Sequence, residues 1–86
     1  MEFEQLRIFV AVAEHRSYSA AARDLFLSHS TTSRAVSALE HELGVTLFNR
    51  DNRILGLTRA GESLLRDARE LLENAEQLKE NLKEFR

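Results

Sequence analysis

Small hydroxyl side chains, two histidines and one arginine share one side of a short helical pattern in the middle of this chain. At helical spacing, between residues 29 and 43, this polar side comprises His29, Ser30, Ser33, Arg34, Ser37 and His41. The plainer interpretation is a Ser/Thr-rich amphipathic helix without a special role, but a merely solvated face is usually rich in Glu and Lys. Small hydrogen-bonding residues let a helix approach another surface closely, and the major groove of DNA admits such a helix. The pattern therefore favours a helix that reads a nucleic acid.

Two arginines follow this helix within a short, turn-rich segment. Arg50 and Arg53 flank an Asp-Asn pair that tolerates turn geometry, between the short apolar runs 47–48 and 54–57. We expect a small two-stranded wing that leans on the helices, because an isolated hairpin is marginal in water. The two arginines are then either solvated loop side chains or, beside a recognition helix, contacts to nucleic acid.

The same residue types do not form a catalytic or metal-binding constellation. His15, His29 and His41 lie on different helices or faces, and the last two are more than about three helical turns apart, too far to share one metal ion. The chain has no cysteine, no carboxylate pair at catalytic spacing and no Gly-rich phosphate loop. We therefore expect no catalytic residue, no metal site and no cofactor.

Three short helices are predicted to hold the polar face in place. The chain has no Pro and only three Gly, which favours helices. Apolar residues at helical spacing predict a first helix over residues 2–15, and Ser19 is the expected N-cap of a second helix from residue 20 to about 26. Ser28 can cap the third helix, and Gly44 can end it. The core-facing stripe of that helix comprises Thr32, Val36, Leu39 and Leu43. This order, with a tight second-to-third connection, predicts a helix-turn-helix.

A long fourth helix is predicted from its N-cap, Thr58, to the end of the chain. Its apolar residues repeat at alternating spacings of four and three, as in a coiled coil: Leu64, Ala68, Leu71, Ala75, Leu78, Leu82 and Phe85. Leu65 and Leu72 add a second apolar edge that is suited to packing on the helix-turn-helix. A lone helix is marginal in water, and the surface of the domain runs out before this helix ends. This regular row of seven apolar residues, called the seam below, therefore predicts a partner helix.

Length and charge fit one small domain with a modest affinity for nucleic acid. The chain has 86 residues and a net charge of −2, which is concentrated in residues 61–86, whereas residues 28–60 carry +1 and two histidines. The N-terminus lacks a basic segment followed by an apolar run, and no apolar run is long enough to span a bilayer. We expect a soluble, cytoplasmic domain that does not enter membranes.

With these elements in this order, the chain resembles the DNA-binding domain of LysR-type transcriptional regulators over essentially all of its length. The segments that carry the resemblance are FVAVAE (9–14), SYSAAA (17–22), LSHS (27–30), SRAV (33–36), LE (39–40), LG (43–44), LFNR (47–50) and LTRAG (57–61). The resemblance implies a mainly α fold: a winged helix-turn-helix of three helices plus a small β-hairpin over residues 1–57, then a linker and dimerisation helix over residues 58–86. It also implies a homodimer through antiparallel linker helices, with a tetramer possible in the full-length protein. An effector ligand would bind a further domain, absent from these residues.

Carried over position by position, the resemblance assigns base reading to the first turn of the third helix. His29 and Ser30 fall where the family commonly has Gln and then Pro. Gln can pair bidentately with adenine, whereas His offers a single donor or acceptor, so the two differ in the base they prefer. Ser30 lacks the fixed φ of Pro but adds a hydroxyl.

The resemblance also assigns contacts to the DNA backbone. Thr31, Ser33 and Arg34 match positions that contact phosphates or bases. Arg50 matches a wing arginine at phosphate, and Arg53 matches one in the minor groove, where narrow A/T-rich segments attract arginine. The full expected DNA-binding set is Ser28, His29, Ser30, Thr31, Ser33, Arg34, Ser37, Arg50 and Arg53.

These observations favour sequence-specific binding of double-stranded DNA by a transcriptional regulator. The alternative is a helix-turn-helix scaffold that serves as a protein-interaction and dimerisation module. Affinity for duplex DNA that falls with salt separates the two hypotheses, because phosphate contacts release counterions.

Overall fold

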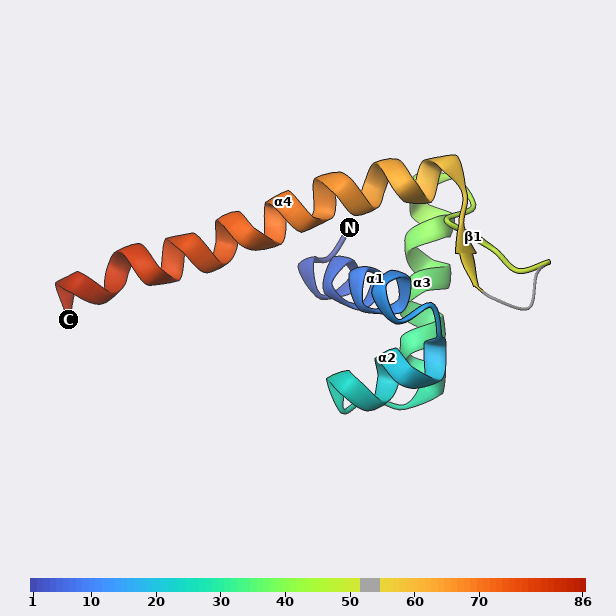
Figure 1. Ribbon diagram of the computed structural model, residues 1–86, viewed down its shortest axis with the longest axis horizontal. Coiled ribbons are helices and arrows are strands. Elements are labelled where there is room, and N and C mark those ends of the chain that lie inside the picture. The colour runs from blue at the N-terminus through green and yellow to red at the C-terminus, as the bar shows by residue number, and fades with distance from the viewer. Residues whose placement is uncertain (52–54) are drawn as a thin grey trace.

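The computed structural model describes residues 1–51 and 55–86 of the chain. Its elements, in chain order, are α1 (Phe3–His15), α2 (Tyr18–Leu25), α3 (His29–Leu43), β1 (Phe48–Asn49), β2 (Gly56–Leu57), α4 (Arg59–Leu82) and the 3-10 turn η1 (Lys83–Phe85). Figure 1 shows the first three helices and the hairpin gathered into a head, from which α4 extends as a long arm to the C-terminus. The molecule measures 49 × 25 × 20 Å. The predicted fold class, mainly helical with a small hairpin and a long last helix, is confirmed.

A two-residue break separates α1 from α2. Arg16 ends α1 in the left-handed conformation (φ 54°), and the extended Ser17 caps α2, its Oγ accepting a backbone hydrogen bond at 3.1 Å. The expectation that Ser19 caps this helix is wrong, because α2 already begins at Tyr18. Either serine can cap a helix locally, and the earlier start brings the Tyr18 ring against Phe48 of the hairpin.

The connection from α2 to α3 is as tight as predicted. Phe26 ends α2 in the left-handed conformation (φ 58°), and Ser28 caps α3, its Oγ accepting a hydrogen bond from the Thr31 N–H at 3.0 Å. Gly44 (φ 69°) ends α3 and its N–H bonds to the Glu40 carbonyl at 2.9 Å. The helix-turn-helix and both predicted ends of its second helix are confirmed.

The core lies where α1, α3 and the hairpin meet. Its most deeply buried apolar residues are Leu6, Ile8, Phe9, Val12, Ala21, Val36, Leu39, Leu47, Phe48 and Ala68. Thr32 is also fully buried, and its hydroxyl donates to the Ser28 carbonyl at 2.9 Å, so that its polar atom is satisfied. Leu43 is 38% exposed, which corrects its assignment to the core stripe. The last turn of α3 passes beyond the core, and the residues that follow it are exposed as well.

The wing is an antiparallel hairpin, in which Phe48 lies opposite Leu57 and Asn49 lies opposite Gly56. Each described strand is two residues long, and β1 begins one residue later than the apolar run 47–48, since Leu47 precedes it. The first turn of α4 packs directly on the backbone before β1. A Cβ at Gly61 would overlap the Leu47 carbonyl oxygen, so only glycine fits there.

The first half of α4 belongs to the head. Thr58 caps it as predicted, its Oγ accepting from the Gly61 N–H at 3.0 Å. Ala68 is buried, and Leu64, Leu65 and Leu72 are half-buried against the core. The prediction that Leu65 and Leu72 pack on the head is confirmed.

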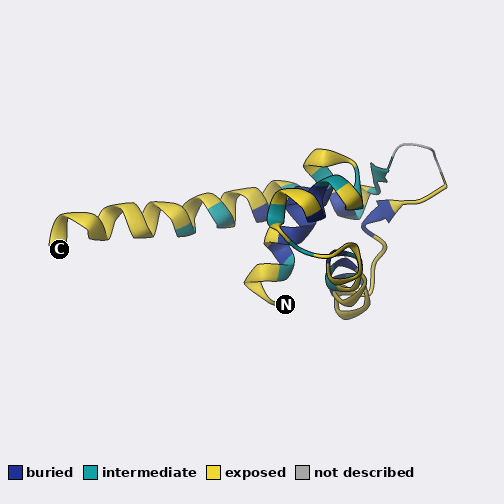
Figure 2. Ribbon diagram, turned by 90° about the horizontal axis from the view of Figure 1, so that it is seen from below, coloured by how far each residue is buried: buried dark blue, intermediate teal, exposed yellow. Residues whose placement is uncertain are grey.

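The second half of α4 leaves the head behind. Figure 2 shows burial in the head and near the start of α4, and a mostly exposed arm beyond it. Leu71, Leu78 and Phe85 are 47%, 65% and 77% exposed. In the described part of the chain, no helix combines the length and the apolar character that crossing a membrane requires.

Candidate nucleic-acid interface

The predicted recognition face of α3 is open to solvent. Its exposed members are Ser28, His29, Ser30, Thr31, Arg34, Ser37 and His41, and Ser33 is half-buried. In the first turn, Ser28 Oγ donates to Thr31 Oγ1 at 2.9 Å while it accepts from the Thr31 N–H. The Thr31 hydroxyl therefore keeps its own proton for an outside acceptor. The face offers short donors and acceptors close to the helix backbone, which suits a close approach.

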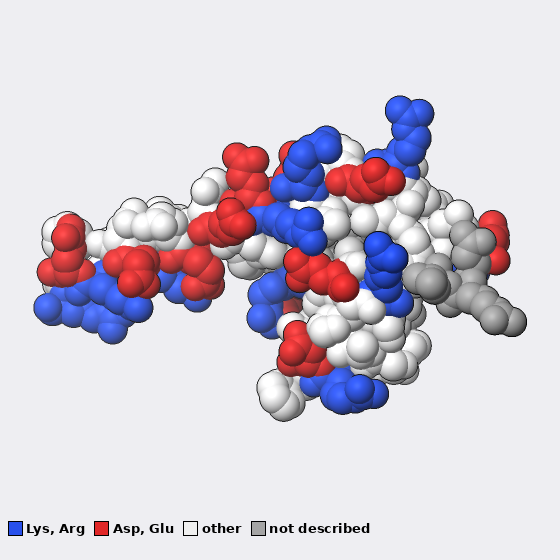
Figure 3. Space-filling view, viewed as in Figure 1, with Lys and Arg blue, Asp and Glu red and all other residues white. Residues whose placement is uncertain are grey.

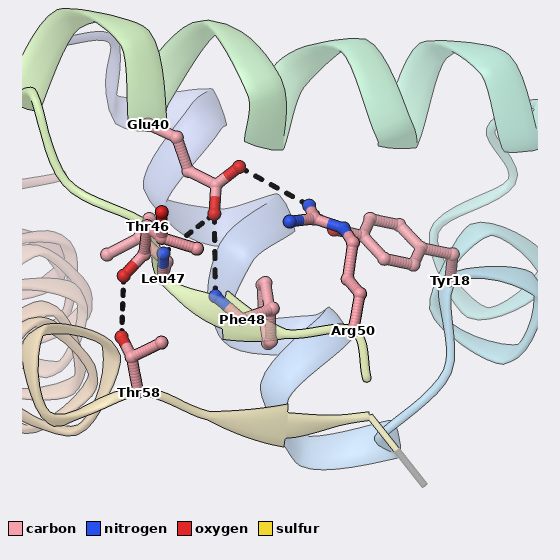
Figure 4. Close-up of polar contacts among 7 residues, drawn as sticks. All are labelled: Tyr18, Glu40, Thr46, Leu47, Phe48, Arg50 and Thr58. Carbon is pink, nitrogen blue, oxygen red and sulfur yellow. Dashed lines mark hydrogen bonds and ion pairs between the residues drawn. The ribbon is translucent and has the colours of Figure 1, made fainter. Parts of the chain in front are cut away.

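Arg50 is held against the head by two residues that sequence reasoning did not assign to the site. Its Nη2 donates to the Tyr18 hydroxyl at 2.7 Å and to Glu40 Oε1 at 3.3 Å, and its guanidinium lies 5.8 Å from the centre of the Tyr18 ring. Figure 4 shows the guanidinium between the Glu40 carboxylate and the Tyr18 side chain. Arginine has five N–H donors, and these two contacts use those on Nη2, so the donors on Nη1 and Nε can serve another acceptor.

Glu40 also fixes the start of the wing. Its Oε2 accepts from the Leu47 N–H at 2.7 Å and from the Phe48 N–H at 3.4 Å, while Oε1 receives Arg50. Thr58, the N-cap of α4, also binds the segment before β1, since its Oγ1 donates to the Thr46 carbonyl at 2.6 Å. One carboxylate therefore joins α3, the strand β1 and the wing arginine (Figure 4).

Burial and pairing keep these groups in defined protonation states. Burial raises the pKa of the Tyr18 hydroxyl above its ordinary value, and the Arg50 charge only partly opposes this. For Arg50, burial lowers the pKa, but hydrogen bonds to Glu40 and Tyr18 outweigh it and raise the pKa above the ordinary value. At neutral pH the site therefore holds a neutral phenol and a fully charged guanidinium.

A chain of aromatic rings connects the core to the first residue of α3. Phe9 and Phe48, both buried, have ring centroids 5.4 Å apart, and the Tyr18 ring meets Phe48 edge-on at 5.9 Å. The His29 ring lies 6.0 Å from Tyr18 at an interplanar angle of 47°. The exposed His29 is thus the outermost ring of a series that begins in the core.

Tyr18 and Glu40 were missed for a physical reason. Glu40 carries one signal in the sequence, an acid at helical spacing beside the core residues Val36 and Leu39. Its partners, however, are backbone groups of a different element. Tyr18 lies 32 residues from Arg50, and no local pattern predicts that contact.

Arg53 lies outside the described residues, and its minor-groove role stays a prediction from the sequence. On the face drawn in Figure 3, acidic and basic side chains are interspersed along α4. Within residues 1–51 and 55–86, no three His, Asp or Glu side chains gather as they would around a metal ion.

A tight helix-turn-helix with an open polar second helix, followed by an antiparallel wing, defines the winged helix-turn-helix class of DNA-binding domain. The family model described as "Bacterial regulatory helix-turn-helix protein, lysR family" matches residues 3–62. The chain belongs to the LysR family and corresponds to its DNA-binding domain, as the resemblance predicted. The family consists of transcriptional regulators and not of enzymes.

Curated relatives match the chain over most of its length. The HTH-type transcriptional regulator ClcR of Pseudomonas putida is 52% identical over 69 residues, which are 80% of this chain and 24% of ClcR. The HTH-type transcriptional activator IlvY of Haemophilus influenzae is 44% identical over 69 residues, again 80% of this chain and 24% of the relative. The chain therefore spans about a quarter of the length of these relatives.

Solved structures of related domains include complexes with DNA. The DNA-binding domain of BenM in complex with catB site 1 DNA has a TM-score of 0.94 at 37% identity, covering 98% of this chain and 93% of that one. The DNA-binding domain of CbnR in complex with DNA has a TM-score of 0.87 at 44% identity, covering 94% of this chain and 93% of that one.

Proposed function

We propose that this domain binds duplex DNA sequence-specifically as a homodimer and thereby regulates transcription. The observation that carries the proposal is the open polar face of α3, held beside a wing arginine that the head orients. The similar domains of BenM and CbnR, solved with DNA, support it.

In the proposed complex the first turn of α3 enters the major groove. His29 and Ser30 read base edges, and Arg34 contacts a phosphate or a guanine. The remaining hydroxyl groups of the face, Ser28, Thr31, Ser33 and Ser37, contact phosphates or bases. Arg50 reaches a phosphate through the N–H groups that Tyr18 and Glu40 leave free. Arg53 reads the minor groove.

The seam of α4 forms the proposed dimer. Of its predicted residues, Leu64 and Ala68 pack against the core of the head, so the proposed contact consists of Leu71, Ala75, Leu78, Leu82 and Phe85. The exposure of this C-terminal part supports an external partner. An antiparallel pair of these helices would place the two heads on an inverted repeat. A longer protein carrying this domain would add an effector-binding domain, with which tetramers can form.

The test is binding to a selected duplex at increasing salt. Sites are first enriched from a random duplex pool at low salt, and the dissociation constant of the best site is then measured across salt concentrations. We expect the logarithm of the association constant, 1/Kd, to fall as the logarithm of the salt concentration rises, with a slope of about −0.9 for each phosphate neutralised. Salt-independent binding, or none to the selected site at low salt, would reject the proposal and favour the helix-turn-helix as a protein-interaction scaffold.

A further inference from the structure

Tyr18 connects the two parts of the proposed interface through different atoms of one side chain. Its ring contacts the ring of His29, the first residue of α3. Its hydroxyl accepts the 2.7 Å hydrogen bond from Arg50, just after β1. A base-reading residue and a phosphate-contacting residue of the proposed interface thus share one neighbour.

The position of Tyr18 is itself fixed by the core. Its ring packs edge-on against Phe48, which is buried and packs in turn on the buried Phe9. Tyr18 is also the first residue of α2, directly after the N-cap Ser17. Moving its ring would therefore disturb both the core and a helix start, so Tyr18 is a rigid support.

A rigid support matters because the side chains it contacts are exposed. An exposed His or Arg samples several rotamers and loses that freedom on binding, which lowers the affinity. Contact with Tyr18 orders the His29 ring before binding, and the hydroxyl orders the Arg50 guanidinium. Groups that are oriented in advance bind with less loss of entropy.

We infer that Tyr18 is a positioning residue for DNA recognition: its ring sets the base preference of His29, and its hydroxyl sets the affinity contributed by Arg50. This inference rests on the function proposed above. It predicts that the two effects separate, because one substitution removes the hydroxyl alone and another removes the ring.

Tyr18→Phe and Tyr18→Leu make this separation. Each variant is measured on the selected duplex and on the same duplex changed at the base pair where His29→Ala loses its preference. Tyr18→Phe should lower the affinity for both duplexes about fivefold, as expected for the loss of one charged hydrogen bond. The ratio of the affinities for the two duplexes should stay unchanged. Tyr18→Leu should reduce the ratio at least about threefold, by loosening a base-edge contact. In a His29→Ala background, Tyr18→Leu should not change the ratio further.

A measurement without DNA checks the contact itself. The His29 ring protons should feel the ring current of Tyr18 in the free domain. Their NMR shifts should stay constant in Tyr18→Phe and move in Tyr18→Leu. Ile8→Val, a conservative core change outside this cluster, controls for general loss of stability and should leave the ratio of affinities unchanged.

The outcomes distinguish this inference from the proposed function. Wild-type binding with an unchanged ratio in Tyr18→Leu would overturn the inference alone. The same holds if the ratio drops equally in Ile8→Val, because the effect would then be general destabilisation. Failure of the wild-type domain to bind DNA would overturn the proposed function and this inference with it.

Discussion

At the scale of single residues, the proposed interface is built from short side chains on a rigid backbone. The first turn of α3 is capped by Ser28, which also holds Thr31, so that the exposed His29 and Ser30 project from a well-ordered helix start. Arg34 follows one turn later on the same face. A short side chain reaches a base edge only if its backbone comes close, and this turn allows that approach.

We predict different roles for His29, which would contact a base edge, and Arg34, which would contribute to affinity on most sequences. His29→Ala should change the preference at one base pair by about 1–3 kcal/mol, whereas Arg34→Ala should weaken binding to most sequences. His41→Ala, at the far end of the same face, is the matched control and should change little. Binding to a panel of single base-pair variants measures all three. Equal weakening of every site by His29→Ala would show that His29 contacts the backbone.

Phe26 illustrates a residue whose local conformation works against stability. It ends α2 at φ 58°, where glycine is the favoured residue, and its side chain is 95% exposed. The chain therefore accepts a strained backbone without burying the ring in the head.

We predict that the free energy of unfolding of Phe26→Gly is about 1 kcal/mol higher than that of Phe26→Ala, because alanine keeps the strain of the left-handed conformation and glycine relieves it. Both variants remove the exposed ring, so their difference isolates the backbone. Chemical denaturation measures it. Equal stabilities of the two variants would show that the turn is not strained.

At the scale of elements, the wing, α3 and α4 are locked to one another by backbone contacts. Glu40 binds the N–H groups at the start of β1, and the Thr58 N–H bonds to the Leu47 carbonyl at 3.0 Å. Gly61 lets the first turn of α4 lie directly on the backbone just before that strand. The hairpin is too short to be stable alone, so these contacts hold it beside α3.

We predict that Gly61→Ala lowers the free energy of unfolding by about 3 kcal/mol, because the added methyl group would overlap a backbone carbonyl oxygen that cannot move aside cheaply. Gly56→Ala is the control. A Cβ at Gly56 would meet no atom of the described residues within 4 Å, so that change should stay within about 0.5 kcal/mol of wild type. Denaturant titration of both proteins tests the difference, and a stable Gly61→Ala protein would contradict the close packing.

Local signals in the sequence predicted the elements well. The Ser28 and Thr58 caps and the left-handed Gly44 each depend on residues within one helical turn, and all three are confirmed. Ser17 and Ser19 are equally suited to cap the helix by their local sequence. The observed cap, Ser17, agrees with the tertiary packing of Tyr18 on Phe48. Periodicity likewise extended the core stripe of α3 one turn too far, because it carries no information on where the core ends.

The arrangement of the site depends on contacts that no local pattern carries. The open face of α3 follows from helical spacing and was predicted. The hold on Arg50 joins three elements, through Tyr18 from α2 and Glu40 from α3. The sequence therefore predicted the exposed polar face of α3, but not the residues that orient the wing arginine.

At the scale of the whole molecule, the arm has an apolar edge that the head does not cover. Its polar sides carry ion pairs within the helix, Lys79–Glu76 and Lys83–Glu80, which are exposed and contribute little to stability. Its apolar edge instead shows large side chains to solvent, ending in Phe85. Helix α4 has 24 residues, too long for the head to bury and long enough to pair along its length.

We predict that the exposed part of the seam holds the dimer together. Leu78→Asp would place a charge in an apolar contact between helices and should give monomers whose heads stay folded. Gln77→Asp adds the same charge one residue earlier, outside the seam, and should leave the dimer intact. The Leu78→Asp monomers should bind the inverted repeat far more weakly, since the second head is no longer tethered near its half-site. Sedimentation of both variants decides the question: a Leu78→Asp dimer with unchanged DNA affinity would mean that another surface joins the two heads, and that the arm docks on a different partner.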